Sequence, residues 1–538
     1  MHARRRFRHL GALSVVALLS MTMLSACSSS SPSSGSSGKV LTVGTYKGIK
    51  GQFTTIQAAV SAAKPGDWVL VAPGDYKEAD DLSATPTHVD RGGFGGVLVT
   101  TSGIHIRGLS RSGVIVDGTK PGAPACSSNA SDQQYGSVQD GKAIGRNGIV
   151  VYKANHVSVD NLTVCNFLSG SADSGNQVWW NGGADSDKIG LHGYTGSYLS
   201  ATSSFYGGES TAATYGIFSS AAAGDGAHWT QLYASNMNDS GMYVGACMQV
   251  CGITIDHVDM EYSALGYSGT NSGGAIVIED SLFANNKDGF DTNTQIRSDP
   301  PAPQNGACPN NGISPITHTH SCWVLRHNVF ANNNNPNVPQ SGGASYGPVG
   351  TGMTLSGGHN DTVINNVFKN NDAWGFLMVP FPDSDSPSFN QTCTGAGGVE
   401  TPGLGCVFDP INDKLANNTF VSNGSFGNPT NGDFGQLALN ANEPSNCFSG
   451  NHTTGAVTPA NLEAKYPTCG VKRAAPDAPA DLLNQALCNT GFSSCPAGTI
   501  YPRVTQIVMH PLPKKLATMP NPCQGVPDSL WCKGGSLS

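Results

Sequence analysis

The chain has 538 residues, including 68 glycines, and charged residues make up only 12% of it. Many glycines and few charges favour a β-rich protein with many tight turns over a helical one. The net charge is -8, because 37 acidic residues outweigh 29 lysines and arginines, and this balance excludes the basic face that nucleic acid binding requires.

Residues 1–27 have the pattern of an export signal. "MHARRRFRHL" supplies the positive charge and "GALSVVALLSMTML" supplies the apolar segment. The following "LSAC" resembles a bacterial lipobox, which implies that Cys27 is the lipidated first residue of the mature protein. The alternative is an ordinary signal peptide with a chance cysteine. Residues 28–38 form a Ser/Gly tether, and no later stretch is long and apolar enough to span a bilayer. We expect an exported protein that is anchored to the membrane by lipid and faces the extracytoplasmic side.

Residues 51–78 carry the first predicted helix. Apolar residues at helical spacing predict an amphipathic helix from about Thr54 to Ala63, followed by Pro-Gly-Asp and a strand. A helix at this point would cover the open end of a first coil and prevent edge pairing. The block resembles the N-terminal cap of pectate-lyase-like β-helix proteins.

An internal repeat dominates the middle of the chain. "SLFANN", "NVFANN", "NVFKNN" and "NTFVSN" share the pattern x-x-Phe-x-x-Asn. The aligned residues are Phe283, Phe330, Phe368 and Phe420, and Asn286, Asn333, Asn371 and Asn423. One short strand per repeat cannot bury its apolar side alone, so the repeats must stack.

Short strands that begin at a glycine also align. These glycines are Gly148, Gly216, Gly241, Gly266, Gly289, Gly352 and Gly375. We therefore predict an all-β fold, a right-handed parallel β-helix over residues 39–445, with an N-terminal capping helix and a disulfide-rich C-terminal cap over residues 446–538. The alternative is a β-sandwich with Asn/Gly turns.

Of the 15 cysteines, 14 remain when Cys27 is set aside, and an even number in an exported protein favours disulfides. Many are near neighbours in the sequence: Cys247/Cys251, Cys308/Cys322, Cys393/Cys406, Cys447/Cys469, Cys488/Cys495 and Cys523/Cys532, which leaves Cys126 with Cys165. The sequence does not fix the connectivity. A metal cluster is disfavoured because no set of cysteines and histidines has zinc spacing.

Alternation along the glycine-led strands predicts one outward strip. Taking the residue after each glycine as inward gives Ile149, Ile217, Met242, Phe290, Met353 and Phe376, all apolar, with Tyr267 as the exception. The strip then contains Val150, Phe218, Tyr243, Ser268, Asp291, Thr354 and Leu377, and two residues further along Tyr152, Ser220, Gly245, Thr270, Asn293, Ser356 and Val379. Rings and polar groups in a row suit a sugar chain, although polar ladders also occur on β-helices without a ligand.

The segment "VWWNG" places Trp179 and Trp180 in a predicted loop. As exposed rings they would be platforms for sugars, and the alternative is partly buried packing.

Two motifs give the stretch 253–379 a resemblance to the family-nine pectate lyases. They are "KDGFD" at 287–291 and "GTGMTLSGG" at 350–358. The resemblance implies that Asp288 and Asp291 hold calcium, which would neutralise a uronate carboxylate so that a base can remove the adjacent proton. The chain departs from the family pattern at Lys287, which replaces the first aspartate, and at Thr354, which stands where the family has its lysine base. The lyase mechanism therefore does not carry over.

Other residues offer alternative chemistry. Lys287, Arg297 and Arg326 are candidate bases or carboxylate clamps. Asp288 and Asp291 could form a hydrolase's acid pair with a carboxylate of an adjacent coil; the candidates are Glu261, Glu279 and Asp280. His318 and His320 could bind a metal or act as a base, although a solvated loop suits them too. Asp288 also suits a plain turn before glycine.

The function expected from these features is an enzyme acting on an extracellular polysaccharide, with lyase or epimerase chemistry ahead of hydrolysis. The alternative is a non-catalytic surface protein that binds glycan or cell wall, and a structural spacer is a third hypothesis. We expect a monomer whose partners are the glycan and, through Cys27, the membrane.

Overall fold

The computed structural model describes residues 38–78, 96–183, 191–220, 226–245, 247, 250–270, 272–293, 322–382, 399–402, 405–489 and 493–538. Several sequence predictions fall outside the described residues: the signal segment, the lipidation of Cys27, Arg297, His318, His320, Cys308 and Cys393.

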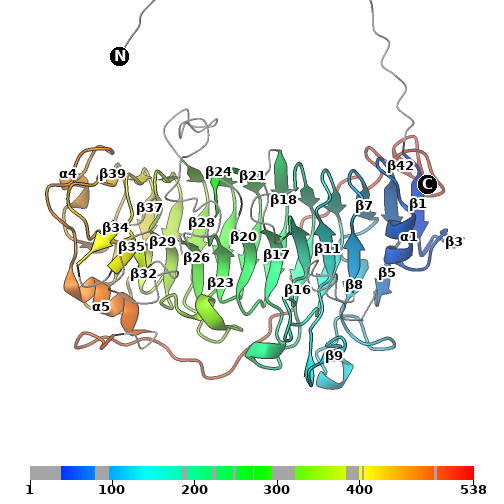
Figure 1. Cartoon of the computed structure of the whole chain (residues 1–538), viewed down its shortest axis with the longest axis horizontal. Coiled ribbons are helices and arrows are strands. Elements are labelled where there is room, and N and C mark those ends of the chain that lie inside the picture. The colour runs from blue at the N-terminus through cyan, green and yellow to red at the C-terminus, as the bar shows by residue number, and fades with distance from the viewer. Residues whose placement is uncertain are drawn as a thin grey trace, which may run out of the picture. The chain divides into compact units, whose positions relative to one another are not determined.

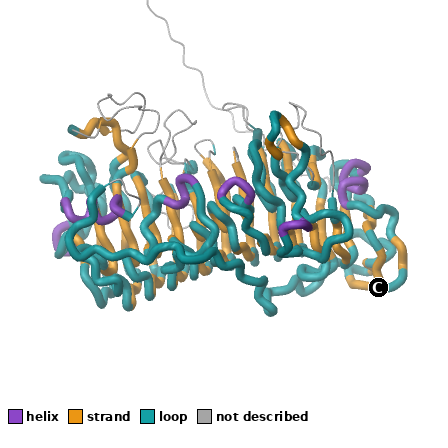
Figure 2. Tube along the Cα trace, turned by 90° about the horizontal axis from the view of Figure 1, so that it is seen from below, coloured by secondary structure: helices purple, strands orange, loops and turns teal. Residues whose placement is uncertain are grey.

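Three long parallel sheets contain most of the described strands (Figure 1, Figure 2). Sheet 1 consists of β1 (Val40–Val43), β4 (Trp68–Val71), β7 (His105–Gly108), β12 (Ser158–Asp160), β15 (Thr195–Ser197), β18 (Ala227–Thr230), β21 (Val250–Asp256), β24 (Gly274–Glu279), β27 (Trp323–Arg326), β30 (Thr362–Ile364), β36 (Lys414–Ala416) and β39 (Cys447–Ser449). Sheet 2 consists of β5 (Gly74–Tyr76), β8 (Val114–Asp117), β13 (Thr163–Cys165), β16 (Ser200–Thr202), β19 (Tyr233–Ser235), β22 (Asp259–Glu261), β25 (Leu282–Ala284), β28 (Val329–Ala331), β31 (Val367–Lys369) and β37 (Thr419–Val421). Sheet 3 consists of β6 (Val97–Val99), β11 (Ile149–Tyr152), β14 (Val178–Asn181), β17 (Tyr215–Ser220), β20 (Ser240–Gly245), β23 (Leu265–Ser268), β26 (Asp288–Asn293), β29 (Thr351–Ser356), β32 (Trp374–Val379), β38 (Gly432–Gln436) and β40 (Val457–Thr458).

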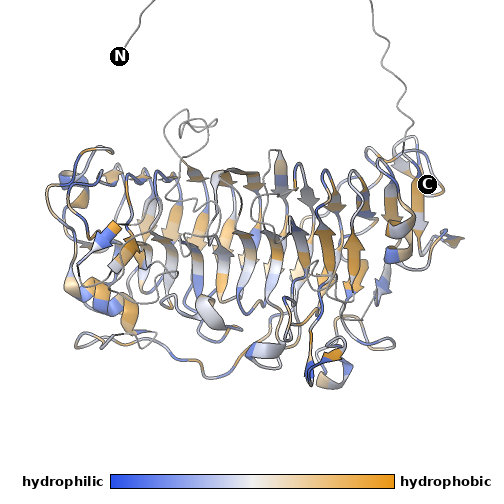
Figure 3. Ribbon diagram, in the orientation of Figure 1, coloured by the Kyte–Doolittle hydropathy of each residue, from blue (hydrophilic) through white to orange (hydrophobic). Residues whose placement is uncertain are grey.

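Each coil passes through sheets 1, 2 and 3 in turn, which confirms the predicted right-handed parallel β-helix. In one coil, Asp280 links β24 to β25 and Asn285 links β25 to β26, with φ of 50° and 60°. These left-handed conformations suit Asp and Asn better than most residues, because their short polar side chains bond locally. Figure 3 shows hydrophobic colouring concentrated on the strands.

The repeat x-x-Phe-x-x-Asn builds two ladders inside the coils. The rings of Phe283 and Phe330 are stacked with centroids 5.3 Å apart, and the series continues through Phe368 and Phe420. The equivalent asparagines bond from coil to coil, Nδ2 to Oδ1, at 3.1–3.2 Å: Asn286 to Asn333, Asn333 to Asn371, and Asn371 to Asn423. The predicted stacking is confirmed.

The N-terminal helix is α1 (Ile56–Ala62), within the predicted span. Thr55 caps it by accepting a hydrogen bond from the Ala58 N–H. The Glu78 carboxylate accepts from the N–H groups of Ile56 and Gln57 at 2.6 and 3.1 Å, which satisfies donors that the first turn leaves unpaired. Ile56, Ala59 and Val60 are buried against the first coils.

The disulfides follow the near-neighbour pattern of the sequence. The described pairs are Cys126–Cys165, Cys247–Cys251, Cys447–Cys469, Cys488–Cys495 and Cys523–Cys532. Cys322 and Cys406 are disulfide-bonded as well.

The end of the chain differs from the predicted cap. Helices α4 (Leu462–Lys465) and α5 (Ala480–Cys488) lie at the C-terminal coils as expected. The segment after α5 instead leaves these coils and runs along the lower edge in Figure 1, and the C-terminus lies beside the first strands. Only part of residues 446–538 therefore caps the C-terminal end. Among the described residues, no helix is apolar and long enough to cross a membrane.

The remaining described elements are small. They are the pairs β2 (Thr45–Tyr46) with β3 (Ile49–Lys50), β9 (Val138–Gln139) with β10 (Lys142–Ala143), and β41 (Cys532–Lys533) with β42 (Ser536–Leu537), a sheet of β33 (Phe381–Pro382), β34 (Val399–Thr401) and β35 (Gly405–Phe408), and the 3₁₀ turns Ala130–Asp132, Glu209–Thr211 and Gly342–Ser345.

A third ladder contains two acids where the asparagine ladder has amides. The Asp361 N–H donates to Asp413 Oδ1 at 2.9 Å, and the Asp413 N–H donates to Asn446 Oδ1 at 3.0 Å. Asn446 uses its amide to donate to Pro410 O and Gln436 Oε1. The second oxygens of Asp361 and Asp413 have no such partner among the described residues. Burial raises the pKa of both carboxyl groups well above the usual range.

We predict that Asp361→Asn stabilises the protein at pH 7. A carboxyl group whose pKa is raised by folding stabilises the native state less and less as the pH rises from its unfolded pKa towards the raised value. Asparagine carries no charge there, so the free energy of unfolding should rise by about 1–3 kcal/mol at pH 7 and by much less at pH 4. Urea unfolding at both pH values measures this. Asn366 belongs to another asparagine ladder, in which it accepts from Asn328 Nδ2 at 3.1 Å and donates to Asn418 Oδ1 at 3.0 Å. Asn366→Asp should have the opposite effect, and an equal effect of Asp361→Asn at both pH values would contradict the explanation.

Candidate functional site

The outer face of sheet 3 carries most of the residues that the sequence singled out. Strand register places one outward row in the order Val150, Trp179, Phe218, Tyr243, Ser268, Asp291, Thr354 and Leu377. Asn293 and Ser356 are paired in a parallel row two residues further along. The predicted strip is therefore correct, and it also includes Trp179.

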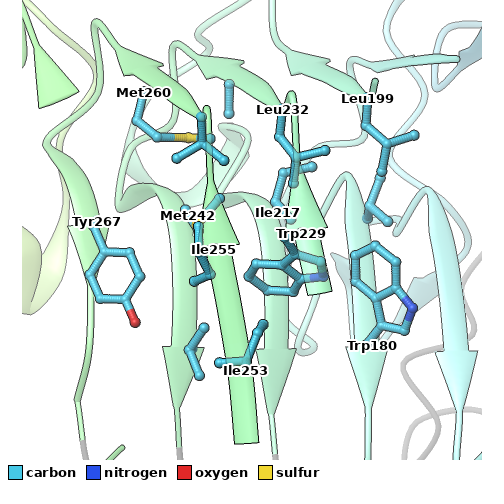
Figure 4. Close-up of a cluster of buried hydrophobic side chains, with 14 of the residues drawn as sticks. Trp180, Leu199, Ile217, Trp229, Leu232, Met242, Ile253, Ile255, Met260 and Tyr267 are labelled. Atoms are coloured by element: carbon cyan, nitrogen blue, oxygen red, sulfur yellow. The ribbon is translucent and has the colours of Figure 1, made fainter. Parts of the chain in front are cut away.

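The residues predicted to face inward do so. Ile149, Ile217, Met242, Phe290, Met353 and Phe376 all lie in the main core, and so does Tyr267. Trp180 joins them with no exposed surface and packs against Trp229 with ring centroids 5.4 Å apart (Figure 4). The loop predicted for Trp179 and Trp180 is wrong, because both lie in β14 on opposite sides of the strand. Trp180 cannot contact a sugar.

The outward rings form a stack of their own. Trp179 stacks on Phe218 at 5.2 Å and Phe218 stacks on Tyr243 at 4.8 Å, with interplanar angles of 13° and 3°. Tyr215 packs against the last two rings at 4.7 and 5.0 Å. The faces of Trp179 and Phe218 therefore contact other rings. Tyr243 ends the stack, and Ser268, a small residue, follows it in the row.

Asp288 and Asp291 lie on the same side of β26 but in different surroundings. Asp288 has no exposed surface. Its carboxylate accepts from the Phe290 N–H at 3.2 Å and from Thr354 Oγ1 at 3.5 Å. A Cβ added at Gly347 would lie only 2.6 Å from Asp288 Oδ2, so the backbone there covers the carboxylate. Burial and the neighbouring charge of Asp291 raise the pKa of Asp288 well above its usual range.

Asp291 is partly exposed. Its carboxylate accepts from Asn293 Nδ2 at 2.6 Å and from Ser356 Oγ at 3.5 Å. Burial raises the pKa of Asp291 to about 6, and these two hydrogen bonds oppose the rise. As the pH rises, Asp291 thus ionises before Asp288 and places a negative charge on this face.

The side chain of Lys287 does not point to solvent, where it could act as the predicted base or carboxylate clamp. It is only 4% exposed, and its ammonium donates to the carbonyl oxygens of Ser345, at 2.7 Å, and Gly347. Burial lowers its pKa to about 8. The lysine therefore fastens the Gly342–Ser345 turn and the residues after it over Asp288.

The structure adds two residues that sequence reasoning missed, Asp239 and Tyr215. Asp239 directly precedes β20, and its carboxylate accepts from the Tyr215 hydroxyl at 3.4 Å. Burial raises the pKa of Asp239 to about 7, and the charge of Asp291 contributes. The sequence spacing could have identified Asp239, because Asp239 stands two residues before Gly241 just as Lys287 stands two residues before Gly289.

Other predicted acids and bases lie elsewhere. Arg326 ends β27 in sheet 1, where its Nε donates to Glu279 Oε2 at 2.6 Å. Glu261 lies in sheet 2 and accepts from Asn285 Nδ2 at 2.9 Å. Asp280 occupies a turn, as expected. These residues are not brought to the aspartates of sheet 3.

The described donors do not fit the calcium site that the resemblance implies. Calcium takes six to eight oxygen ligands. Here Asp288 is covered by backbone, Asn293 turns an N–H group towards Asp291, and the ammonium of Lys287 replaces the family's first aspartate. Within the described residues, the one close group of three acidic, histidine or cysteine ligand atoms is Asp117 with Cys126 and Cys165, and that cysteine pair is a disulfide.

No protein-family model matches the sequence, and no curated protein matches it. Solved structures do match the coordinates. A polygalacturonase of Erwinia carotovora ssp. carotovora is 11% identical, with 79% of this chain and 96% of that chain covered and a TM-score of 0.40. The A-module of a mannuronan C-5 epimerase of Azotobacter vinelandii is 11% identical, with 75% and 92% covered and a TM-score of 0.39. A pectate lyase is 13% identical, with 89% and 91% covered and a TM-score of 0.37. At these values the likeness carries no information on activity.

We predict that calcium leaves the stability of the protein unchanged. A ligand at one hundred times its Kd would add about 2.7 kcal/mol to the free energy of unfolding, which a melting curve detects readily. Melting temperatures with millimolar calcium and with chelator should therefore coincide. Lys287→Asp, which restores the family's pattern of three aspartates, is the matched comparison and should respond more strongly to calcium. A rise in the melting temperature of the unsubstituted protein with calcium would contradict the prediction.

Proposed function

We propose that the protein is a glycoside hydrolase that cleaves an extracellular polysaccharide of low charge on the outer face of sheet 3. The observation that carries the proposal is the pair of partly exposed carboxyl groups, Asp239 and Asp291, whose pKa values lie near 7 and near 6. Hydrolysis of a glycosidic bond needs one carboxylic acid that is protonated and one carboxylate that is ionised.

The two environments suggest which group has which role. Asp239, with the higher pKa, is the candidate general acid that protonates the leaving oxygen, and the Tyr215 hydroxyl positions it. Asp291 ionises first and is the candidate base or nucleophile, oriented by Asn293 and Ser356. Tyr243, at the end of the ring stack, is the candidate platform for a sugar ring.

The charges on this face favour hydrolysis over β-elimination. Elimination needs a cation to neutralise a uronate carboxylate and a base to remove the adjacent proton. In the described part of the chain, Lys287 is the cation that lowers the pKa of Asp288, and no cation acts in this way on Asp239 or Asp291. Its ammonium is held by backbone carbonyl groups. The Asp291 carboxylate, which ionises first, would repel a polyuronate, so a neutral polymer is the better substrate.

The proposed location rests on the N-terminal sequence. The positive segment, the apolar segment and "LSAC" support export and lipid anchoring at Cys27, with the protein facing the extracytoplasmic side. The disulfides agree with an oxidising compartment.

We predict a bell-shaped dependence of kcat/KM on pH, with its maximum between about 6 and about 7. Activity should rise as Asp291 ionises above its pKa of about 6 and fall as Asp239 loses its proton above its pKa of about 7. Asp291→Asn should remove the acidic limb and Asp239→Asn the alkaline limb, each with a loss of roughly 10²–10⁴-fold. New reducing ends from a panel of neutral and acidic polysaccharides measure the activity.

Asp280→Asn is the matched control, because Asp280 lies in the same coil as Asp291 but in a turn where asparagine is equally suited. Absorbance of an unsaturated sugar, measured in the same samples, would identify a lyase and contradict the proposal. Binding of a polysaccharide without any turnover, unchanged by Asp291→Asn, would support the glycan-binding alternative instead.

A further inference from the structure

The outer face of sheet 1 changes character along the helix. In most coils its outward row is polar: Arg107, Asp160, Ser197, Thr230 and Asp256 follow one another in register. In the first coils the same row holds Leu70, and the adjacent outward row holds Val40 and Trp68. Leu41, Val69 and Ile106 already fill the core from the other side of these strands. The first coils therefore carry apolar side chains on both faces of the sheet.

The C-terminal residues cover this apolar patch. Trp531, Cys523 and Cys532 have no exposed surface and form one cluster with Leu70, Ala72 and Leu109. Trp531 lies edge-on to Tyr46 with ring centroids 6.1 Å apart. At the rim, Arg107 Nη1 donates to Gln524 O at 2.7 Å and Lys47 Nζ donates to Ser538 O at 3.1 Å.

Residues 521–538 have a compact structure of their own, which we call the C-terminal module. The Cys523–Cys532 disulfide and the pair β41–β42 close it. Asn521 Nδ2 donates to Gly535 O at 2.8 Å, and the Ser538 N–H donates to Trp531 O at 3.0 Å. These internal links hold the loop that presents Trp531.

The segment between α5 and the module makes widely spaced contacts. Asn337 accepts from the Thr505 N–H at 2.9 Å, and Asn236 exchanges two hydrogen bonds with the backbone of His510 at 2.7 and 3.0 Å. The rings of Tyr262 and His510 stack at 3.7 Å. Lys514 and Lys515 are exposed. Nearer the module, Arg111 Nη1 donates to Ala517 O at 2.8 Å. The segment is thus anchored by hydrogen bonds and ring contacts, whereas the side chains with no exposed surface are those of the module.

We propose that the apolar outer face of the first coils is a docking site and that the C-terminal module is its ligand. The noncovalent contacts of the module are sufficient to hold it there without the covalent connection through the preceding segment. Truncating a buried tryptophan anchor commonly removes most of the affinity of an interface. Coverage by the module also explains why these positions are apolar. Without it, Val40, Trp68 and Leu70 would form an exposed apolar surface prone to association.

The test cuts the connection in the folded, full-length protein. A specific protease recognition sequence is inserted between Lys514 and Lys515, and the cut protein is passed over a size-exclusion column under oxidising conditions. We expect the fragment from Lys515 onward to elute with the rest of the chain. Trp531→Ala should weaken its retention roughly 30-fold or more. Leu530→Ala, at the neighbouring residue with half of its surface exposed, should leave retention unchanged.

Circular dichroism before and after cutting controls for folding of the coils, which the cut does not interrupt. Exchange of a labelled fragment between cut copies would support the proposal, because it demonstrates docking without a covalent link. Loss of the fragment from the unsubstituted protein would overturn it, and so would full retention of the Trp531→Ala fragment.

Discussion

The amide ladders between coils are the interaction on which the rest of the structure depends. The turns along this ladder bury asparagine side chains, and a buried amide without partners costs about 1–3 kcal/mol. Bonding Asn286 to Asn333 and onward satisfies these groups only if successive coils stay in register. The ladder also requires glycine beside it: a Cβ at Gly289 would lie 2.5 Å from Asn333 Nδ2 and 2.4 Å from Gly352 O. The repeated glycines are thus a consequence of the ladder.

The strand around Gly289 also shapes the candidate site. Residues three apart in a regular strand point to opposite faces. Asp288 nevertheless contacts Thr354, which is paired with Asp291 in the outward row, while Phe290 enters the core. Regular alternation is therefore broken beside Gly289, and the two aspartates share one face. Burial keeps both pKa values high, and the charge of Asp291 raises the pKa of Asp288 further, so the site holds protons as well as negative charge.

The sequence predicted the fold well because the signals of a coil are local. The Phe and Asn repeats, the glycine-led strands and the inward apolar row each follow from a few neighbouring residues. The site was predicted less completely, since its residues come from separate coils. Arg326 looked equivalent to Lys287 in sequence, yet it lies in a different sheet. Asp239 was missed because register across coils, and not the motif around Asp291, brings it near. The path of the C-terminal segment has no periodic signal, and the outward Trp68 and Leu70 do not mark its end uniquely, because Val277 and Ile364 stand in the same outward rows.

The return of the C-terminal residues to the first described strand affects how the protein would respond to mechanical load. The last residue is within hydrogen-bonding distance of Lys47, close to the first strand. A pulling force applied between the first strand and the last residue would act on the contacts around Trp531 before it reached any coil. The stacked sheets would bear tension only after those contacts had parted. Fluorophores attached near Lys47 and Ser538 would accordingly report this parting directly, as a rise in the distance between them.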